Sequence, residues 1–215
     1  MKDGSSFQAP AAAPNMVPSV LDSINEMRCV IAMSPEELQA IARDFPVKTL
    51  KKGTYLLKEG QIASKCFYIY KGLVREYYLM DGEARTTAFY LEGDSLSSNV
   101  SRMYKTPAKH YWECIEETTV SICTEIAQNE LFRQFPRFES LCRIGVEEQF
   151  SQYQEAMAIY MISSPAERYL NLLKNKPELL DRVPQYQLAS YIGVKPESLS
   201  RIRGRIRTGT RQHCK

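Results

Sequence analysis

Between residues 47 and 125 the chain alternates apolar and polar positions in short runs rich in β-branched and aromatic side chains. Glycines divide these runs at intervals of 7, 12, 10 and 11 residues, from Gly53 to Gly93, which is close to the turn spacing of a β-sandwich or β-barrel. Between two of the runs, Asp81-Gly82 has the sequence of a two-residue hairpin turn. The pattern predicts a β-domain with strands at 47–51, 54–58, 66–70, 73–80, 83–91, 111–116 and 119–125.

Residues 94–109 interrupt this alternation. They are polar and irregular, and they end in Thr106-Pro107 followed by further polar positions. We expect a long inserted loop with room for a short helix.

The rest of the chain has helical patterns. Ser34 and Ser164 are each followed by proline and then, at the third helical position, by glutamate, which is the sequence of a capping box. From about Glu125 apolar positions recur every three or four residues, as in a coiled coil. A long helix with one apolar stripe buries it either in its own core or against a second copy, and we favour the dimer. The stripe consists of Cys142, Val146, Phe150, Tyr153, Met157 and Tyr160.

Residues 183–203 have the sequence of two short helices that meet at a tight turn. Ala189 is small enough for close helix packing, Gly193 permits a positive φ at the turn, and Val194 fills the space between the helices. These features indicate a helix-turn-helix. Its apolar core would be Leu188, Ile192, Leu199 and Ile202.

On the second of these helices, Glu197 and Arg201 are four residues apart and share one face. In a DNA major groove a carboxylate can accept a hydrogen bond from cytosine N4, and a guanidinium can donate to guanine O6 and N7. The alternative is an intrahelical salt bridge worth ~0.3–0.5 kcal/mol. Arg203, Arg205 and Arg207 follow and are suited to phosphate contacts.

Charge is distributed unevenly. Residues 182–215 carry eight Lys/Arg and one acid, a net charge of +7, whereas residues 1–181 carry a net charge of −4. A basic end on an acidic body is typical of a polyanion-binding module joined to another domain. The alternative is a solvated basic tail.

Composition narrows the function classes. Apolar residues make up 44% of the chain, enough for a real core, and the sequence has neither a membrane-length apolar run nor a secretory signal. The six cysteines are dispersed and the chain has two histidines, so we expect reduced thiols, no metal and a cytoplasmic protein. Nucleophile-elbow and phosphate-loop motifs are absent, and we expect no catalytic residues and no enzyme.

The run Glu197-Ser198-Leu199-Ser200-Arg201 closely resembles the recognition helix of the Crp–Fnr family, whose pattern is E-[ST]-x-S-R. The resemblance covers about residues 35–207, including the glycine-divided strands and the long helix. It implies an α+β fold: an N-terminal double-stranded β-helix (a jelly-roll-like β-roll), a long dimerisation helix and a C-terminal winged-helix-like helix-turn-helix domain that binds palindromic DNA. The base-contacting residues would be Glu197, Ser198, Ser200 and Arg201, and the phosphate-contacting residues Lys195, Arg203, Arg205 and Arg207.

This sequence departs from the family in its effector region. Gly93 to His110 lacks the Gly-Glu pair and the Arg-Ser/Thr-Ala run of the cyclic-nucleotide cassette, so we expect no control by cyclic AMP. Cys29 is the sole cysteine in the N-terminal region, so an iron–sulfur sensor is not expected either. Pro196 replaces a base-contacting arginine of the cyclic-AMP receptor, which favours a half-site with a TGA core. The basic residues of the loop form either a candidate anion pocket or a solvated surface: Arg102, Lys105, Lys109 and His110.

The predicted domains are a flexible tail at 1–17, a β-roll sensor at 18–130, a connecting and dimerisation helix at 131–162, and a DNA-binding domain at 163–215. Expected partners are double-stranded DNA and a second copy of the chain, with RNA polymerase and an unknown small-molecule effector as candidates; no cofactor and no membrane partner is expected. The alternative function is a β-roll sensor that acts through protein contacts, and a cupin-type metal enzyme is disfavoured because the β-region has one histidine. Eight residues after Arg207 leave little room for the wing.

Overall fold

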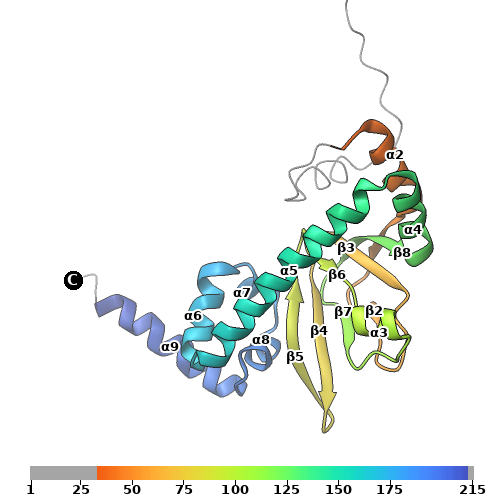
Figure 1. Cartoon of the computed structure of the whole chain (residues 1–215). Helices are drawn as coiled ribbons and strands as arrows, with labels where there is room; N and C mark the ends of the chain where they lie inside the picture. The colour runs from red at the N-terminus through yellow and green to blue at the C-terminus, as the bar shows by residue number, and fades with distance from the viewer. Residues whose placement is uncertain (1–32, 213–215) are drawn as a thin grey trace, which may run out of the picture.

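The computed structural model describes residues 33–212, with side chains to residue 207. The expected tail at 1–17 and two of the cysteines, Cys29 and Cys214, lie outside the described residues. The predicted α+β class is confirmed: two antiparallel sheets are followed by a long helix and a group of shorter helices (Figure 1).

The β-roll consists of two four-stranded sheets, ordered β1-β8-β3-β6 and β2-β7-β4-β5. Every strand pair in them is antiparallel. The seven predicted strands agree with the structure to within two residues at their ends, and the inserted loop holds an eighth strand, β6, and a short helix, α3. The bounds are β1 Val47–Leu50, β2 Tyr55–Leu57, β3 Lys65–Lys71, β4 Val74–Met80, β5 Glu83–Tyr90, β6 Ser95–Leu96, α3 Asn99–Tyr104, β7 Tyr111–Cys114 and β8 Thr118–Thr124.

Two glycine positions explain how the strands turn. Asp81 and Gly82 both have positive φ, 53° and 79°, as a two-residue hairpin turn between β4 and β5 requires. Gly72 has φ +103°, and a Cβ atom there would lie 2.6 Å from the Glu117 carbonyl oxygen and from Cα of Thr118. Only glycine therefore lets the end of β3 pass so close to the start of β8.

Besides α3, seven helices surround the β-roll or extend from it in the described residues. Both predicted capping boxes are present: the hydroxyls of Ser34 and Ser164 accept from the backbone of Glu37 and Glu167, whose carboxylates accept from the serine backbone. The bounds are α2 Pro35–Asp44, α4 Glu125–Gln134, α5 Arg137–Ile162, α6 Pro165–Asn175, α7 Leu179–Arg182, α8 Gln185–Ile192 and α9 Pro196–Gln212.

The segment 131–162, expected as one helix, is divided at Phe135-Pro136 into the end of α4 and the whole of α5. Proline cannot donate the backbone hydrogen bond that would continue α4. Figure 1 shows α5 running from α4 across the β-roll to the C-terminal helices. The break at Pro136 allows α5 to run in a different direction from α4.

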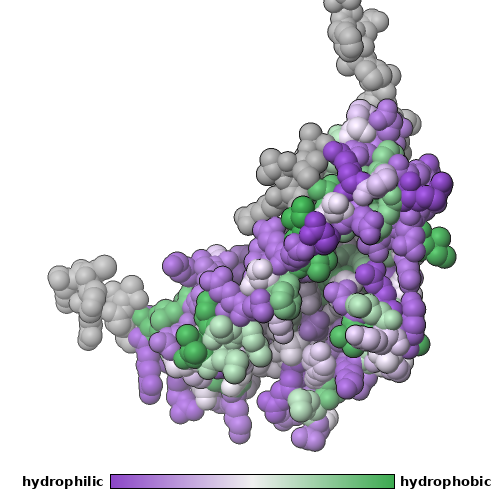
Figure 2. Space-filling view, in the orientation of Figure 1, coloured by the Kyte–Doolittle hydropathy of each residue, from purple (hydrophilic) through white to green (hydrophobic). Residues whose placement is uncertain are grey.

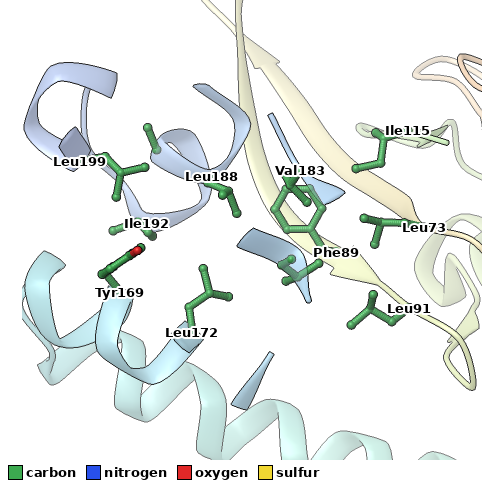
Figure 3. Packing of buried hydrophobic residues seen from close by; sticks show 12 residues of the cluster. Leu73, Phe89, Leu91, Ile115, Tyr169, Leu172, Val183, Leu188, Ile192 and Leu199 are labelled. Atoms are coloured by element: carbon green, nitrogen blue, oxygen red, sulfur yellow. The ribbon is translucent and has the colours of Figure 1, made fainter. Parts of the chain in front are cut away.

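The C-terminal helices share a hydrophobic core with the β-roll. Figure 3 shows Leu73, Phe89, Leu91 and Ile115 of the β-roll facing side chains of α6, α8 and α9. The sequence boundary near residue 163 therefore does not separate two independent cores. The C-terminal side chains of this shared core are Tyr169, Leu172, Leu179, Val183, Leu188, Ala189, Ile192 and Leu199.

Candidate nucleic-acid interface

The turn between α8 and α9 has the geometry of a helix-turn-helix. Gly193 takes a left-handed conformation, φ +83°, and its N–H donates to the carbonyls of Ala189 and Ser190. The N–H of Val194 also donates to the Ala189 carbonyl, at 2.9 Å. The turn residues predicted from the sequence therefore close the end of α8 and allow α9 to start three residues later.

The first turns of α9 have one buried and one exposed face. Leu199 is 1% exposed and packs into the shared core, with Ile202 and Ile206 beside it. With about 100° between successive helix positions, Glu197 and Arg201 lie opposite these three residues, and both are exposed. The structure thus presents to solvent the carboxylate and the guanidinium that the sequence singled out.

The other predicted base-contacting residues lie beside this pair. Ser200 is exposed on the outward side, whereas Ser198 is half-buried. The Ser198 hydroxyl accepts a hydrogen bond from Nη2 of Arg201 at 3.4 Å. Within residues 33–207, neither Glu197 nor Arg201 forms an ion pair, so the intrahelical salt bridge considered from the sequence is not formed.

The predicted phosphate contacts occupy both flanks of α9. At the same helix periodicity, Arg203 and Arg207 follow one flank and Arg205 the other. Arg203 donates to the side-chain oxygen of Gln185, which ties it to the first residue of α8. Lys195 is exposed in the turn before α9. A hollow of about 480 Å³ lies along the first flank, lined by Gln185, Pro196, Ser200, Arg203, Gly204 and Arg207.

Arg168 of α6 connects this unit to the long helix. Its Nη2 and Nε donate to the carbonyl of Tyr160, at 2.9 and 3.2 Å, and its Nη1 donates to the carbonyl of Ile192 at 3.0 Å. The guanidinium also stacks 3.7 Å from the centre of the Tyr160 ring. The ends of α5 and α8 are therefore held by one side chain, a contact that the sequence analysis did not anticipate.

The docking of α8 on the β-roll was also not anticipated. The Ser190 hydroxyl accepts from the backbone N–H of Thr86 at 2.9 Å and donates to the carbonyl of Ala84 at 3.2 Å. Both partners belong to β5. Nothing in the spacing of Ser190 within α8 indicates this, because the contact joins residues about a hundred positions apart.

Arg182 of α7 adds an ionic contact between the same two parts. Its Nη2 lies 2.8 Å from Glu92 and 2.5 Å from Glu116, both in the β-roll. The hydrogen bonds that Arg182 donates to these carboxylates raise its pKa. Burial raises the pKa of Glu92, but hydrogen bonds from Arg182 and from backbone N–H groups outweigh it, so the pKa lies below its ordinary value.

The apolar stripe on α5 is exposed in the single chain. Every residue from Val146 to Ile162 is exposed, and Phe150 and Tyr153 are 59% and 67% exposed. Figure 2 shows hydrophobic patches among hydrophilic side chains along the course of α5. The core of the described chain therefore does not bury the stripe, which was one of the two alternatives.

The four basic residues of the inserted loop lie in two different surroundings. Arg102 donates to Oε1 of Gln128 at 3.0 Å, and Lys105 pairs with Glu125 at 2.8 Å, so both lie beside α4. His110 instead packs against the Trp112 ring, with its Nε2 buried and without a hydrogen bond. Lys109 is exposed. An anion pocket shared by all four residues stays a prediction.

A polar cluster in the second sheet was missed from the sequence. The Glu76 carboxylate accepts from the Trp112 indole at 2.9 Å and from the Tyr90 hydroxyl at 3.1 Å, and its Oε2 lies 4.0 Å from Nε2 of His110. Burial, with the Glu76 charge nearby, raises the pKa of Tyr78 and Tyr90. The pairing of Glu76 with Trp112 across β4 and β7 depends on strand register, which the sequence pattern does not specify.

Residues 33–212 contain neither a membrane-spanning helix nor a cluster of metal ligands. No helix in this range combines the length and apolar character needed to cross a membrane. The same residues contain no group of three or more His, Cys, Asp or Glu side chains placed to hold a metal ion.

Comparison of the sequence with protein-family models and with curated proteins finds no match. Comparison of the fold with solved structures finds FixK2 of Bradyrhizobium japonicum, with a TM-score of 0.63 and 18% identity over 77% of this chain and 86% of that one. The c-di-GMP responsive global regulator CLP of Xanthomonas campestris has a TM-score of 0.63 and 12% identity, over 82% and 93% of the two chains. A CooA mutant of Carboxydothermus hydrogenoformans has a TM-score of 0.60 and 15% identity, over 91% and 86%.

These matches define the class of fold. The chain has the architecture of Crp–Fnr regulators, in which a β-roll of the cyclic-nucleotide-binding type precedes a C-terminal helix-turn-helix. The resemblance stated from the sequence is confirmed at the level of the fold.

Proposed function

We propose that this chain is a sequence-specific transcription regulator of the Crp–Fnr type. The observation that carries the proposal is the outward face of α9, where Glu197 and Arg201 are exposed without ion-pair partners in the described chain and arginines follow on both flanks. A helix that enters a major groove needs base-contacting groups at its centre and phosphate-contacting groups on either side. The structural neighbours are transcription regulators and not enzymes, which agrees with the proposal.

The regulator acts as a homodimer through α5. The stripe from Val146 to Tyr160 supports this, because a second copy is the partner that can cover the same stripe on both chains. A two-fold axis along α5 would place two copies of α9 in successive major grooves, ~34 Å apart. The target would therefore be a palindrome, and Pro196 favours half-sites with a TGA core.

Cyclic AMP is not the effector in this proposal. The segment from Gly93 to His110 lacks the family's phosphate-binding arginine, and one of its lysines, Lys105, pairs with Glu125 on the surface. A lysine also cannot provide the bidentate hydrogen bonds of an arginine. The effector and any contact with RNA polymerase stay open as predictions.

The test is fluorescence anisotropy of the full chain with a labelled TTGA-N6-TCAA duplex and with a scrambled duplex, at two salt concentrations. We expect tighter binding to the palindrome. Glu197→Ala and Arg201→Ala should each weaken that binding by ~1–3 kcal/mol and reduce the preference for the palindrome. Arg207→Ala should weaken binding to both duplexes and lower the salt dependence.

Arg85→Ala is the matched control. Like Arg201→Ala and Arg207→Ala, this variant removes one positive charge, but from an exposed arginine of the β-roll that pairs with Glu83. It should leave DNA binding unchanged. Equal, salt-sensitive binding of the wild type to both duplexes would contradict the specific site. No binding to either duplex at low salt would favour the sensor that acts through protein contacts.

A further inference from the structure

Two cysteines lie directly opposite each other in the first sheet. Cys66 of β3 is the register partner of Cys123 of β8. N–H groups alternate in direction along each strand, and Ile122 donates to the Pro46 carbonyl while Ile69 donates to the Asp94 carbonyl, both away from the β3–β8 pairing. Cys66 and Cys123 therefore form a hydrogen-bonded pair in the ladder, for which the Cα separation is typically about 5.5 Å. That Cα separation is within the range that a disulfide spans. The Cβ atoms of such a pair are typically about 5.5 Å apart, more than the roughly 3.5–4.5 Å of a disulfide, so closure of the bond requires a local shift of the two strand ends.

The surroundings of the two sulfur atoms differ. Nη1 of Arg102 donates to Sγ of Cys66 at 3.3 Å, and Sγ of Cys66 donates to the Ser97 hydroxyl at 3.3 Å. Reactive cysteines typically lie in partly exposed positions beside a cationic side chain, as Cys66 does. Cys66 is also half-buried, so small solutes can reach it.

Cys123 has the opposite character. Burial raises the pKa of its thiol to about 12, so it stays protonated at neutral pH and does not react first with an oxidant. One accessible thiol beside an arginine and one protonated thiol directly opposite are the two parts of a redox-sensing pair.

We propose that Cys66 and Cys123 are a peroxide-sensitive thiol pair that closes to an intramolecular disulfide. The Cys66 thiolate attacks one oxygen of hydrogen peroxide, the O–O bond breaks, and after proton transfer the products are a sulfenic acid and water. Sγ of Cys123 then attacks the Cys66 sulfur, loses its proton and displaces a second water as the S–S bond forms. In sum, two thiols and one hydrogen peroxide give one disulfide and two waters.

The position of the pair indicates what the disulfide would change. Cys123 precedes Thr124, whose hydroxyl accepts from the N–H of Ala127 and caps the start of α4. Arg102, which holds Cys66, also donates to Gln128 of α4. A disulfide at Cys66 would change the sulfur that Arg102 contacts, at the joint between the β-roll and the helices that lead to α5.

The test treats the reduced full chain with hydrogen peroxide, blocks remaining thiols with an alkylating reagent, and maps disulfides by mass spectrometry of a non-reduced digest. We expect a peptide pair linked through Cys66 and Cys123, reversed by dithiothreitol. Cys142→Ser is the control, because Cys142 is exposed on α5 and lies close enough to Cys123 to affect its titration; this variant should still form the Cys66–Cys123 bond.

Two further variants test the assigned roles. Cys123→Ser should leave a sulfenic acid on Cys66 that a dimedone reagent labels, whereas Cys66→Ser should leave Cys123 unlabelled. Arg102→Gln should slow oxidation of Cys66 several-fold at neutral pH, because the guanidinium donor beside its sulfur is lost. The proposal is overturned if the main disulfide contains Cys142 or any of the other three cysteines, or if peroxide leaves Cys66 unmodified. The readout needs no DNA, so it is independent of the proposed function.

Discussion

Gly193 shows how one residue serves two contacts of the DNA-binding unit. Its positive φ closes the turn between α8 and α9, and it also leaves room for the long helix. A Cβ atom at this position would lie 2.9 Å from the Tyr160 hydroxyl and 3.3 Å from Nη1 of Arg168. Glycine is therefore required both by the backbone conformation and by the approach of α5.

Gly193→Ala should lower the free energy of unfolding by about 1–3 kcal/mol, because alanine is strained at positive φ and would displace Tyr160. Thermal or denaturant unfolding followed by circular dichroism measures this. Gly204→Ala is the matched control. Gly204 is inside α9, where an added Cβ atom would meet nothing within 4 Å, so alanine there should stabilise by roughly 0.5–1 kcal/mol. A neutral Gly193→Ala variant would contradict the packing described for the turn.

The long helix α5 is the element whose partner lies outside the single chain. Its buried contacts in the described structure are at its first turn, where Phe138 is 5% exposed. Arg137, at the start of the helix, pairs with the buried Glu37 of α2. One end of α5 is therefore fixed to α2 and α4 and the other to α6 through Arg168, while the apolar stripe between them faces outward.

Phe150→Lys should convert the dimer to a monomer, since it places an unpaired charge in the centre of the proposed seam. Size-exclusion chromatography with light scattering across a concentration series measures the change. Ser151→Lys adds the same charge one position later on the opposite side of the helix, close to Glu147 and Glu155, and should leave the dimer intact. A monomeric wild type, or equal effects of the two variants, would contradict the dimer seam.

The elements were predictable because they depend on local sequence. The capping boxes at Ser34 and Ser164, the turn at Asp81-Gly82 and the helix-turn-helix around Gly193 each depend on residues a few positions apart. The periodicity of the stripe predicted a helix but continued the segment through Pro136, where the chain breaks. Of the candidate interface, the outward position of Glu197 and Arg201 followed from helix spacing alone.

Contacts between distant residues were not predictable in this way. Ser190 with β5, Arg182 with Glu92, and Glu76 with Trp112 all depend on how elements meet in space. Such contacts leave no periodic signal in one sequence, because either partner alone is an ordinary polar residue of a helix or strand. For the same reason, the sequence alone does not show that Cys66 lies opposite Cys123. That follows from the register of β3 and β8.

At the scale of the whole molecule, the DNA-binding helices and the β-roll form one packed body. Leu188 and Leu73 are both fully buried in the core that they share, and Tyr191 of α8 packs edge-on against Phe89 of β5, with ring centres 5.3 Å apart. Ser190 and Arg182 add polar contacts on either side of this core. The orientation of α9 relative to the β-roll is thus set by packing, and not by a free linker.

The ionic part of this contact should respond to acid. Because the pKa of Glu92 is lowered in the folded chain, its contribution to stability is present above the unfolded pKa of about 4.5 and is lost as the pH falls through the folded value. Glu92→Gln should therefore lose less stability than the wild type below pH 4.5. The difference should be under about 1 kcal/mol, since Glu92 is 41% exposed and solvent screens the pair.

Denaturant unfolding at a series of pH values measures this difference. Glu83→Gln is the control, because the exposed Glu83 carboxylate pairs with Arg85 of the same hairpin, whereas Glu92 pairs with Arg182 of α7. Its pH dependence should follow the wild type. A Glu92→Gln variant that also follows the wild type through acid would show that Arg182 does not contribute to the docking through this carboxylate.

The shared core limits how this architecture can be recombined. A chimera that joined the chain after residue 163 to a foreign β-roll would leave Leu188 and Ile192 without Phe89 and Leu91 beside them, and apolar surface would be exposed to water. A graft that also carried residues 73–91, the hairpin with its flanking leucines, would keep Leu73, Phe89 and Leu91 in that contact. For protein engineering, and for gene fusion during evolution, the exchangeable unit of this chain is therefore the helix-turn-helix together with the hairpin it packs on.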